Sequence, residues 1–499
     1  MATSGPPWDS QRIHELVKEE FGQRPLVLVS NREPYEHRQT PQGVRVDRPI
    51  GGLTGALDPV LQATGGTWVA WGSGSADRET ADELGRVAVP PERPAYTLRR
   101  IFLTPQEVDG FYYGYANRAL WPLCHLLIER AQFSRGAWRH YAAVNRRFAE
   151  AVLEEMQDAS PAVWFQDYHL ALCPALVREA RPQALLAHFW HIPWPPPDIF
   201  RVCPQRRELL EGLLGNDLIG LQTEDYVRNF LACVEAELGL DADVEAGTVA
   251  IGRRMVSVCA FPISIDAAWF ARAAAAPSTV RLVRRLRQHY GLEGVAVGLG
   301  VDRLDYTKGI RERLQALDLF FSKYPEYRGR FTFIQIAVPS RTRIEAYRRL
   351  RGEIEALIEE INARYGEAGW RPIHYLAQGV RQAVLVAYYQ LADLVVVSSL
   401  MDGMNLVAKE YVTSRPDGQG VLLLSELAGV SRELHGSVPI NPFDIEGLAD
   451  ALARALTMDS EERRERMRAM RAQVQARNIY EWMARTLLDL GKVARAPRG

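Results

Sequence analysis

The segment from Leu394 to Tyr411 constrains the fold of this chain more than any other part of the sequence. It begins with the apolar run Leu394–Val397, whose length and β-branched content are typical of a buried parallel strand. Asp402 and Gly403 follow as a turn, and the residues from Met404 onward have the pattern of a helix. A strand, a tight turn and a helix N-terminus in succession aim backbone N–H groups at the space above the strand. The segment therefore predicts an open parallel α/β sheet with an anion-binding edge.

Two carboxylates of this segment are spaced to meet the two ends of a nucleotide sugar. The separation of Asp402 and Glu410 corresponds to ~12 Å along a helix axis, which is about the length of such a ligand. One acid would accept hydrogen bonds from the sugar hydroxyls, the helix N–H groups would bind the diphosphate, and the second acid would accept from the ribose. The alternative is an N-cap aspartate and a solvated glutamate, and this spacing alone leaves both open.

The same alternation of strand and helix patterns recurs along the chain. Apolar runs that predict strands lie at 26–30, 162–165, 185–190, 218–221, 256–261, 295–301, 331–338, 373–376, 394–397 and 421–425. An alanine-rich stretch between Pro262 and Pro277 separates the two halves. We predict an α/β fold of two doubly wound, Rossmann-like domains that face each other across a cleft. The predicted domains are 1–265 and 266–478, with a last helix over 479–499 that crosses back to the first.

Composition and charge exclude several classes of partner. The chain has 60 basic and 61 acidic residues, whereas a standing nucleic-acid partner favours a basic excess. No apolar run approaches the length of a membrane span, and residues 1–23 lack the apolar core of a signal peptide. The five cysteines are scattered and form no CxxC pair, which indicates reduced thiols and no metal cluster. We expect a cytoplasmic protein with no nucleic-acid partner, no membrane partner and no bound metal.

Basic residues follow the predicted strands of the second half. Arg303 and Lys308 lie on a strand-to-helix turn, where a planar guanidinium and a compact ammonium together suit a diphosphate. Lysine is scarce in this arginine-rich chain, so its use at position 308 is suggestive. The alternative is a surface salt bridge to Asp302 or Asp305.

Polar residues also stand at the ends of the predicted strands of the first half. Arg32, Asp167, His169 and His191 have this position, and ligands of open parallel sheets bind at the carboxyl ends of strands. The glycines at 51 and 52 open a predicted helix and would allow backbone to approach a phosphate. The sequence GGLTG matches neither a P-loop nor a dinucleotide fingerprint, so a plain loop-to-helix junction is the alternative.

Aromatic residues are concentrated in the first half. Trp68 and Trp71 flank one strand, and Tyr112 and Trp121 belong to a second aromatic stretch. Aromatic faces with a polar edge suit sugars, although core packing is the alternative for any single ring. Together with the basic turn, these residues indicate group transfer from a nucleotide sugar to a small polar acceptor. The cationic pair would stabilise the departing diphosphate, which elsewhere is the work of a metal ion.

The chain resembles glycosyltransferase family 20, the trehalose-6-phosphate synthases, which have a GT-B fold. The matching motifs, in family order, are Ser-Asn-Arg (30–32), Gly-Gly-Leu (51–53), Trp68, Tyr112, Trp121, Gln-Asp-Tyr-His (166–169), His-Ile-Pro (191–193), Arg-Leu-Asp-Tyr-Thr-Lys-Gly (303–309), Arg341 and Asp-Gly-Met-Asn-Leu-Val-Ala-Lys-Glu-Tyr (402–411). The resemblance implies glucose transfer from a nucleoside diphosphate glucose to glucose 6-phosphate, giving trehalose 6-phosphate with retention. It implies an ion-pair-like path on one face of the sugar, no protein nucleophile and no cofactor.

The resemblance also assigns residues. The catalytic residues it implies are Asp167, His191, Arg303, Lys308 and Asp402. The donor-binding residues are Gly51, Gly52, His191, Arg303, Lys308, Asp402, Gly403, Met404, Asn405, Leu406, Val407 and Glu410. The acceptor-binding residues are Arg32, Trp68, Tyr112, Trp121, Asp167, Tyr168, His169 and Arg341.

Two relatives within the family remain as alternatives. Arg-Glu-Pro-Tyr at 32–35 also occurs in glucosylglycerol-phosphate synthases, which use glycerol 3-phosphate, although His169 and Arg341 follow the trehalose pattern. A non-catalytic sugar-phosphate sensor would lack the clamp residues, which are all present. The chain shows no phosphatase domain, so we expect a separate trehalose-6-phosphate phosphatase. The sequence is silent on the nucleotide base of the donor, and a homo-oligomer is possible.

Overall fold

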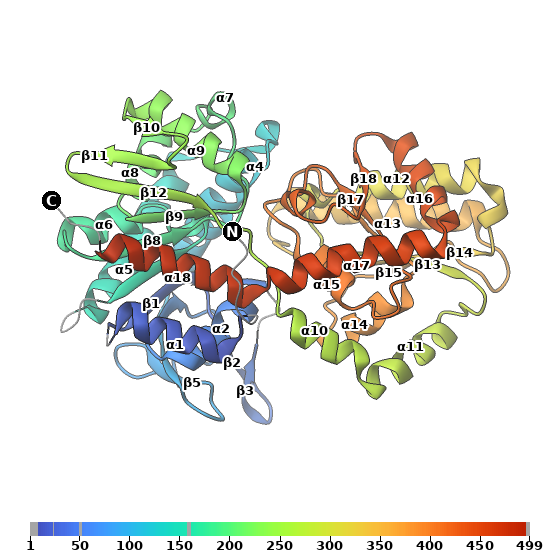
Figure 1. The fold of residues 1–499 in the computed structure, drawn as a ribbon, viewed down its shortest axis with the longest axis horizontal. Helices are drawn as coiled ribbons and strands as arrows, with labels where there is room; N and C mark the ends of the chain where they lie inside the picture. The colour runs from blue at the N-terminus through green and yellow to red at the C-terminus, as the bar shows by residue number, and fades with distance from the viewer. Residues whose placement is uncertain (1–7, 23, 49–51, 157–160, 496–499) are drawn as a thin grey trace. The chain divides into compact units, whose positions relative to one another are not determined.

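A computed structural model of the chain describes residues 8–22, 24–48, 52–156 and 161–495. It divides into two compact units (Figure 1). Unit 1 comprises Met1–Ile263 and Ile479–Gly499, and unit 2 comprises Ser264–Asn478. The boundary expected from the sequence lies after residue 265, and the last helix, expected to return to the first domain, belongs to unit 1.

Unit 1 is built on a sheet of ten strands in the described residues. From edge to edge they are β10 (Ala242–Asp243), β11 (Thr248–Ile251), β12 (Arg254–Ala260), β9 (Leu218–Leu221), β8 (Leu185–Phe189), β7 (Ala162–Gln166), β1 (Leu26–Arg32), β4 (Thr67–Trp71), β6 (Tyr96–Ile101) and β5 (Arg86–Val89). All pairs from β12 to β6 are parallel, and the edge strands are antiparallel. The chain runs outward from β1 on one side and returns to β7 on the other, so the strand order reverses between β1 and β7.

Helices and a hairpin complete unit 1. The helices are α1 (Ser10–Phe21), α2 (Gly52–Thr64), α3 (Pro105–Glu107), α4 (Trp121–Cys124), α5 (Arg135–Glu155), α6 (Cys173–Ala180), α7 (Pro197–Phe200), α8 (Arg206–Leu213), α9 (Glu224–Leu238) and α18 (Ile479–Arg495), with 3₁₀ turns η2 (Ile128–Arg130) and η3 (Tyr168–Leu170) and a π-helix η1 (Val108–Leu120). Strands β2 (Glu36–Thr40) and β3 (Gly43–Asp47) form a separate antiparallel hairpin.

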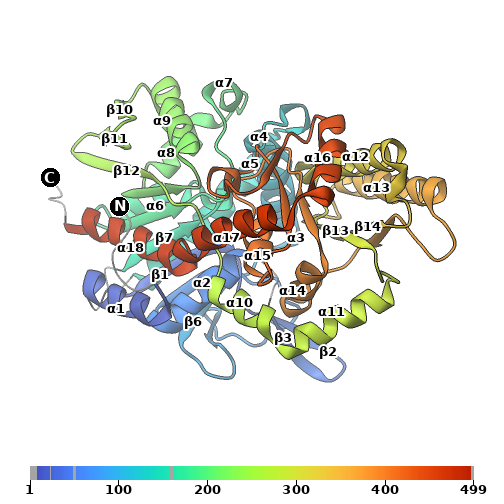
Figure 2. The same cartoon turned by 45° about the vertical axis from the view of Figure 1, so that its right-hand side comes forward.

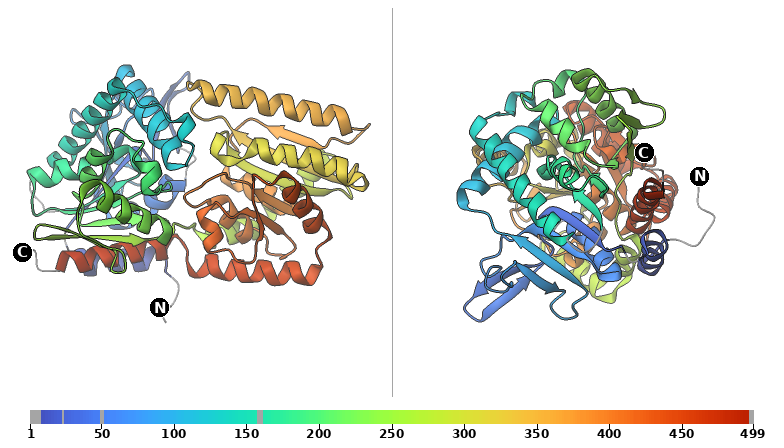
Figure 3. Two further views of the ribbon diagram at one scale, coloured as in Figure 1. Left: turned by 90° about the horizontal axis from the view of Figure 1, so that it is seen from above. Right: turned by 90° about the vertical axis from the view of Figure 1, so that its left-hand side faces the viewer.

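The last helix, α18, packs in unit 1 because one of its faces is apolar. Trp482, Leu487 and Leu490 recur at helical spacing and are buried. The helix lies beside α1, as Figures 1 and 3 show, and the indole of Trp482 donates to the carbonyl of Phe261 at 3.0 Å. Burying each such side chain contributes about 1.5–3 kcal/mol, which fixes the C-terminal segment to this unit.

Unit 2 contains a six-stranded sheet that is parallel throughout. Its strands in order are β15 (Ile373–Leu376), β14 (Phe331–Val338), β13 (Ala296–Arg303), β16 (Leu394–Val397), β17 (Val421–Ser425) and β18 (Val438–Ile440). Numbered along the chain, this is the order 3-2-1-4-5-6 of a doubly wound dinucleotide-binding sheet, with its switch point between β13 and β16. The predicted α/β class is confirmed.

Helices cover both faces of this sheet. They are α10 (Ala267–Ala275), α11 (Pro277–His289), α12 (Ile310–Lys323), α13 (Glu345–Tyr365), α14 (Gln382–Leu391), α15 (Leu406–Thr413), α16 (Ile445–Thr457) and α17 (Ser460–Ala476), with 3₁₀ turns η4 (Tyr306–Lys308), η5 (Pro325–Tyr327) and η6 (Gly429–Arg432). Figure 2 shows α12, α13 and α16 on one side and α10, α11 and α14 on the other. The first group shares one apolar core with the strands.

The described residues can be searched for membrane-spanning helices, metal sites and disulfides. No helix among them is long and apolar enough to cross a membrane. No group of three or more His, Cys, Asp or Glu side chains in the same residues is arranged to hold a metal ion. The five cysteines are free thiols, and four of them are buried.

Candidate active site

Four of the predicted site residues end or follow the strands at the switch points of the two sheets. In unit 2, β13 ends at Arg303 and β16 leads into the turn that carries Asp402. In unit 1, β1 ends at Arg32 and β7 leads directly to Asp167. At a switch point, neighbouring connections leave the sheet in opposite directions and open a crevice above the strand ends. Topology therefore brings together, within each unit, residues that are distant in the sequence.

Two loops are joined above the switch point of unit 2. The Ser398 hydroxyl donates to the carbonyl of Gly309 at 2.9 Å, and the amide of Leu400 donates to the carbonyl of Thr307 at 2.8 Å. Gly309 has φ +61°, and a Cβ there would lie 2.0 Å from the Ser398 carbonyl oxygen. Only glycine fits this position, which explains why the basic turn ends in Lys-Gly.

Lys308 and Asp402 form a close ion pair across these loops. The Lys308 Nζ lies 2.5 Å from Asp402 Oδ2, and the two side chains are 12% and 13% exposed. Ser399 Oγ and Asn405 Nδ2 each lie 3.1 Å from the same carboxylate oxygen. The sequence left a salt bridge of Arg303 or Lys308 to Asp302 or Asp305 as the alternative, and the close partner of Lys308 is Asp402. Asp302 instead pairs with Arg313 and Asp305 with Arg341.

The helix that follows Asp402 begins at Leu406 and not at Met404 as predicted. Asn405 has φ +93° and caps the helix by accepting from the amide of Ala408 at 3.2 Å. Gly403 and Met404 are buried, so they can contact a ligand only through backbone atoms. Leu406 and Val407 are partly exposed in the first helical turn. The N–H groups of that turn have no intrahelical acceptor and suit a phosphate or a sugar oxygen.

Glu410 lies farther along α15 and is partly accessible. The hydroxyl of Tyr389 donates to its Oε2 at 2.7 Å. Burial raises the pKa of Glu410 to about 7, and the hydrogen bond from Tyr389 opposes that shift. A carboxylate with this pKa changes charge near neutral pH, and the solvated-glutamate alternative is wrong for it.

Arg303 and Arg341 differ in exposure. Arg303, the last residue of β13, is exposed, as a group that meets a soluble ligand requires. The Arg341 side chain is 3% exposed, and its Nη1 lies 3.1 Å from Asp305 Oδ2 and 2.5 Å from the Tyr347 hydroxyl. Arg341 belongs to unit 2, whereas the other predicted acceptor-binding residues belong to unit 1.

Rings gather near Arg32 in unit 1. Its Nη2 donates to the hydroxyl of Tyr112 at 3.2 Å, and the Tyr112 ring stacks on His169 at 5.8 Å between centroids. Tyr168 packs against His169 and Trp121 at 4.0 and 5.8 Å. The predicted residues Arg32, Tyr112, Trp121, Tyr168 and His169 thus form one cluster.

Trp68 does not offer a face to a ligand, and its prediction as an acceptor-site residue is corrected. It is 0% exposed, and its indole donates to Ser30 Oγ at 2.8 Å. Trp71 at the end of the same strand is partly exposed and packs against Tyr112 at 5.9 Å between centroids. Because the strand enters the core with Trp68 and leaves it at Trp71, the second tryptophan is the one in the ring cluster.

Asp167 and His191 are adjacent in unit 1. Asp167 has φ +71°, and its Oδ1 accepts from the amide of His191 at 3.3 Å. His191 Nε2 lies 2.9 Å from Gln166 Oε1. Burial lowers the pKa of His191 to about 3, so its imidazole is neutral at physiological pH.

Gly51 lies outside the described residues. Gly52 is the first residue of α2.

Comparison with known proteins decides the family. A model of "Glycosyltransferase family 20" matches residues 24–492. The chain belongs to glycosyltransferase family 20. A trehalose-6-phosphate synthase of Mycobacterium avium is 40% identical over 477 residues, which cover 94% of this chain and 95% of that protein. A bifunctional trehalose-6-phosphate synthase/phosphatase of Thermoproteus tenax is 40% identical over 468 residues, which cover 92% of this chain and 62% of that protein.

A solved structure of the family matches the whole fold. The α,α-trehalose-phosphate synthase (UDP-forming) of Burkholderia xenovorans, in complex with glucose-6-phosphate, has a TM-score of 0.84 and 33% identity. The match covers 93% of this chain and 99% of that one. The predicted GT-B fold and the resemblance to family 20 are confirmed.

Backbone strain marks the site of this family 20 member. Among described residues other than glycine, four have positive φ: Leu126, Asp167, Arg341 and Asn405. Three of the four are predicted site residues. Positive φ costs energy for residues with a side chain, and such strain concentrates where function demands a special geometry.

Sequence reasoning missed several residues around the site. Gln166 hydrogen-bonds to His191, and Tyr389 donates to Glu410, but neither contact follows from local pattern. Asn31 is 3% exposed, and neither of its amide atoms has a hydrogen-bond partner among the described residues. An unmet buried polar group costs about 1–3 kcal/mol, which a bound ligand or water offsets. The sequence signal for Asn31 was its place between Ser30 and Arg32, at the end of a predicted strand.

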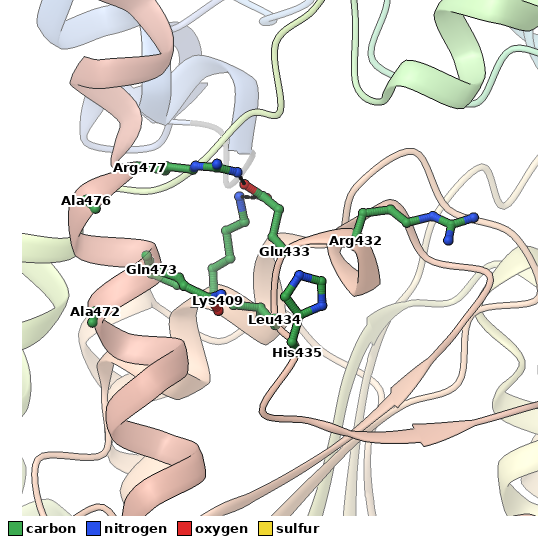
Figure 4. A pocket seen from close by; sticks show the side chains of 10 residues that line it. Lys409, Arg432, Glu433, Leu434, His435, Ala472, Gln473, Ala476 and Arg477 are labelled. Carbon is green, nitrogen blue, oxygen red and sulfur yellow. Dashed lines mark ion pairs between the residues drawn. The ribbon is translucent and has the colours of Figure 1, made fainter. Parts of the chain in front are cut away.

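A polar cavity of about 450 Å³ in unit 2 is separate from these groups. Figure 4 shows Lys409 and Arg477 reaching the same carboxylate, that of Glu433, at 2.6 and 3.6 Å. The Lys409 side chain is 2% exposed. None of the predicted donor-binding residues lines the cavity, and its central charges are paired with one another. We assign this cluster to the packing of α15 against α17.

Proposed function

We propose that the protein transfers glucose from UDP-glucose to glucose 6-phosphate and forms α,α-trehalose 6-phosphate with retention of the donor configuration. Family membership supports the reaction class, and the UDP-forming Burkholderia xenovorans relative, solved with glucose-6-phosphate, supports the substrates. The observation that carries the proposal is the Lys308–Asp402 pair beside the N-terminus of α15 at the switch point of unit 2.

Donor binding falls to unit 2. Arg303 and Lys308 pair with the diphosphate, the first-turn amides of α15 meet the phosphate and the glucose, and Glu410 accepts from the ribose. When the glycosidic bond breaks, negative charge grows on the diphosphate. A nearby ammonium stabilises that charge more in the transition state than in the ground state. Asp402 then exchanges its ion pair with Lys308 for hydrogen bonds from glucose hydroxyls.

Acceptor binding falls mainly to unit 1. Arg32, whose Nη2 donates to Tyr112, binds the phosphate of glucose 6-phosphate together with Tyr112 and Tyr168, and the ring cluster packs against the sugar. Asp167 and the neutral His191 present hydrogen-bonding groups to the sugars. Arg341 is assigned to the acceptor phosphate as well, as the family motif implies.

The bond changes balance without a protein nucleophile. The bond between the glucose anomeric carbon and the diphosphate oxygen breaks, and the anomeric hydroxyl oxygen of the acceptor bonds to the same face of that carbon. The hydroxyl proton leaves with the nucleoside diphosphate. The cationic groups hold the departing anion close, so the acceptor enters on the face that the anion leaves.

Product analysis tests this function. Purified protein with UDP-glucose and glucose 6-phosphate is expected to give one disaccharide phosphate whose two anomeric protons both show α couplings by ¹H NMR. A β coupling, or hydrolysis to free glucose without a disaccharide, would contradict the proposal.

The two arginines are expected to separate the substrates kinetically. Arg303→Ala should raise the KM for UDP-glucose about 30-fold and leave the KM for glucose 6-phosphate within about threefold, because a charge-assisted contact to the diphosphate is lost. Arg341→Ala should do the reverse. Each variant is the control for the other in steady-state assays. Equal losses for both substrates in either variant would remove that residue from its assigned site.

Glu410 is expected to make donor binding depend on pH. With a pKa of about 7, its carboxylate is ionised above pH 7 and accepts strongly from ribose hydroxyls, whereas below pH 7 it is protonated and accepts less. The KM for UDP-glucose should rise about tenfold from pH 8.5 to 5.5, a change that corresponds to ~1.4 kcal/mol. Glu410→Gln should show a high KM that does not change with pH, and Glu446→Gln, at an exposed site in the same unit, should behave as wild type. If the KM for UDP-glucose still depends on pH in Glu410→Gln, another residue causes that dependence.

A further inference from the structure

One buried carboxylate, Asp305, organises the basic groups of unit 2. It is 0% exposed, and its Oδ1 accepts from both the amide and the hydroxyl of Thr307 at 3.1 Å. These bonds cap the short helix η4, which carries Lys308. Its other oxygen, Oδ2, lies 3.1 Å from Arg341 Nη1. The same side chain therefore contacts both the start of the helix that carries Lys308 and a cation from the loop after β14.

Tyr347 closes this contact into a triangle. Its hydroxyl lies 3.1 Å from Asp305 Oδ2 and 2.5 Å from Arg341 Nη1. Burial raises the pKa of Tyr347 well above its ordinary value, so the hydroxyl keeps its proton, donates it to Asp305 and accepts from Arg341. The guanidinium carbon of Arg341 also lies 5.6 Å from the centroid of the Tyr347 ring.

The backbone of Arg341 is strained, which indicates that the surrounding contacts hold this residue in place. Arg341 has φ +49°, which an arginine adopts at a cost. It lies in the loop that follows β14, and its carbonyl accepts from the amide of Ile344 as the chain turns into α13, the helix of Tyr347. Three segments thus hold one guanidinium: the loop after β13, the loop after β14 and the first turn of α13.

The charges around Asp305 favour a role beyond packing. Arg341, Arg303 and Lys308 all lower its pKa against the effect of burial, so one buried anion faces three cations. Because Asp402 is paired with Lys308, three cations lie in this cluster with two carboxylates, and an anionic ligand would balance the remaining positive charge. A guanidinium held by hydrogen bonds is pre-organised and loses less freedom when it binds a phosphate.

We propose that Asp305 and Tyr347 are positioning residues that orient Arg341 toward the phosphate of the acceptor and that Asp305 links this arginine to the donor clamp. This inference rests on the proposed function, which supplies the acceptor phosphate. The Tyr347 ring also packs on Tyr306 of η4, at 5.1 Å between centroids, and a phenylalanine keeps that contact. Loss of the Tyr347 hydroxyl therefore acts on the acceptor side, through Arg341. Asp305 acts on both sides, because it also caps the helix of Lys308.

Steady-state kinetics of the full chain with both substrates tests the assignment. Tyr347→Phe should raise the KM for glucose 6-phosphate about tenfold and leave the KM for UDP-glucose within about twofold. Asp305→Asn should raise both. Tyr365→Phe is the matched control, because Tyr365 lies on the same helix and its hydroxyl donates to the carbonyl of Asp318 at 3.1 Å. It should leave both constants unchanged.

Inorganic phosphate provides a second readout that a purely structural role would not move. It should compete with glucose 6-phosphate in the wild type, with an inhibition constant that rises about tenfold in Tyr347→Phe and stays constant in Tyr365→Phe. If Tyr347→Phe does not fold, the same measurements on Asp305→Asn test the inference. An unchanged KM for glucose 6-phosphate in Asp305→Asn refutes it.

The outcomes separate the inference from the function beneath it. A wild type that does not turn over glucose 6-phosphate refutes the proposed function and, with it, the acceptor role of this cluster. An active wild type whose Tyr347→Phe variant keeps its acceptor KM, or loses affinity for both substrates equally, refutes the inference alone.

Discussion

Replacing Lys308 with methionine is expected to lower kcat/KM for UDP-glucose by about 10²–10³, the range for losing one preorganised group that stabilises transition-state charge. Lys308 Nζ is 2.5 Å from Asp402 and only 12% exposed, so its charge acts in a partly desolvated site. Methionine keeps the length of the side chain and removes the charge. Asp402 retains Ser399 and Asn405 as donors, so the free energy of unfolding should change by less than about 2 kcal/mol.

Lys323→Met is the matched control for this experiment. Lys323 lies in the same unit and also forms an ion pair with an aspartate, Asp450, but the side chains are 42% and 49% exposed. Exposed pairs contribute about 0–1 kcal/mol, so activity and stability should both stay close to wild type. A loss smaller than tenfold in Lys308→Met, or an equal loss in Lys323→Met, would show that Lys308 has a structural role only.

Replacing Arg100 with methionine is expected to lower the free energy of unfolding of unit 1 by about 3–5 kcal/mol, because the change leaves buried acids without their cation. The Arg100 side chain is 0% exposed and lies 2.8 Å from Glu33 and 3.0 Å from Asp77. It also donates to the carbonyl of Tyr35 at 2.9 Å. Glu33 follows Arg32 directly and accepts from the amide of Ser73 at 2.8 Å, so this cluster anchors the loop after the acceptor arginine.

The protonation state of Glu33 explains how two buried acids can lie beside Arg100, and it suggests double variants that extend the test. Burial and a hydrogen bond with Asp77 raise the pKa of Glu33 to about 9, so Glu33 keeps its proton at neutral pH and a single carboxylate charge faces Arg100. Adding Glu33→Gln to Arg100→Met should recover little of the loss, whereas adding Asp77→Asn should recover more, because it removes the charge left behind. Urea unfolding measures each variant.

Arg38→Met is the control on the same loop region. Arg38 pairs with Glu36, but its side chain is 55% exposed, so the expected change is below about 1 kcal/mol. If Arg100→Met and Arg38→Met cost the same, the buried cluster does not stabilise the unit as argued.

Local pattern predicted the strands of unit 2 well. The apolar runs 331–338, 373–376, 394–397 and 421–425 coincide with β14 to β17, because strands buried on both faces read as unbroken apolar stretches. Strands β5, β6, β10, β11 and β18 and the hairpin β2–β3 were not predicted, since short strands and strands with partly exposed residues lack that signal. The π-helix η1 has no sequence signature, although it carries the aromatic stretch that was singled out.

Predictions about the site succeeded where a residue's position on its own element decides its role and failed where packing decides it. Arg303, Lys308 and Asp402 are at strand ends, so topology alone brings them near each other. Trp68 and Trp71 share one strand, and only the packing of that strand shows which of them is exposed. The partners of Arg341 and Glu410 are set by tertiary contacts that join separate elements of unit 2.

The most direct test of the proposed function measures nucleoside diphosphate release from UDP-, GDP- and ADP-glucose, each offered glucose 6-phosphate or glycerol 3-phosphate. The proposal predicts release from UDP-glucose with glucose 6-phosphate and not with glycerol 3-phosphate. Release with glycerol 3-phosphate alone would contradict the acceptor assigned to Arg32 and Arg341 and move the protein to the glucosylglycerol-phosphate branch. Release with none of the pairs would contradict catalysis itself and favour a sugar-phosphate sensor.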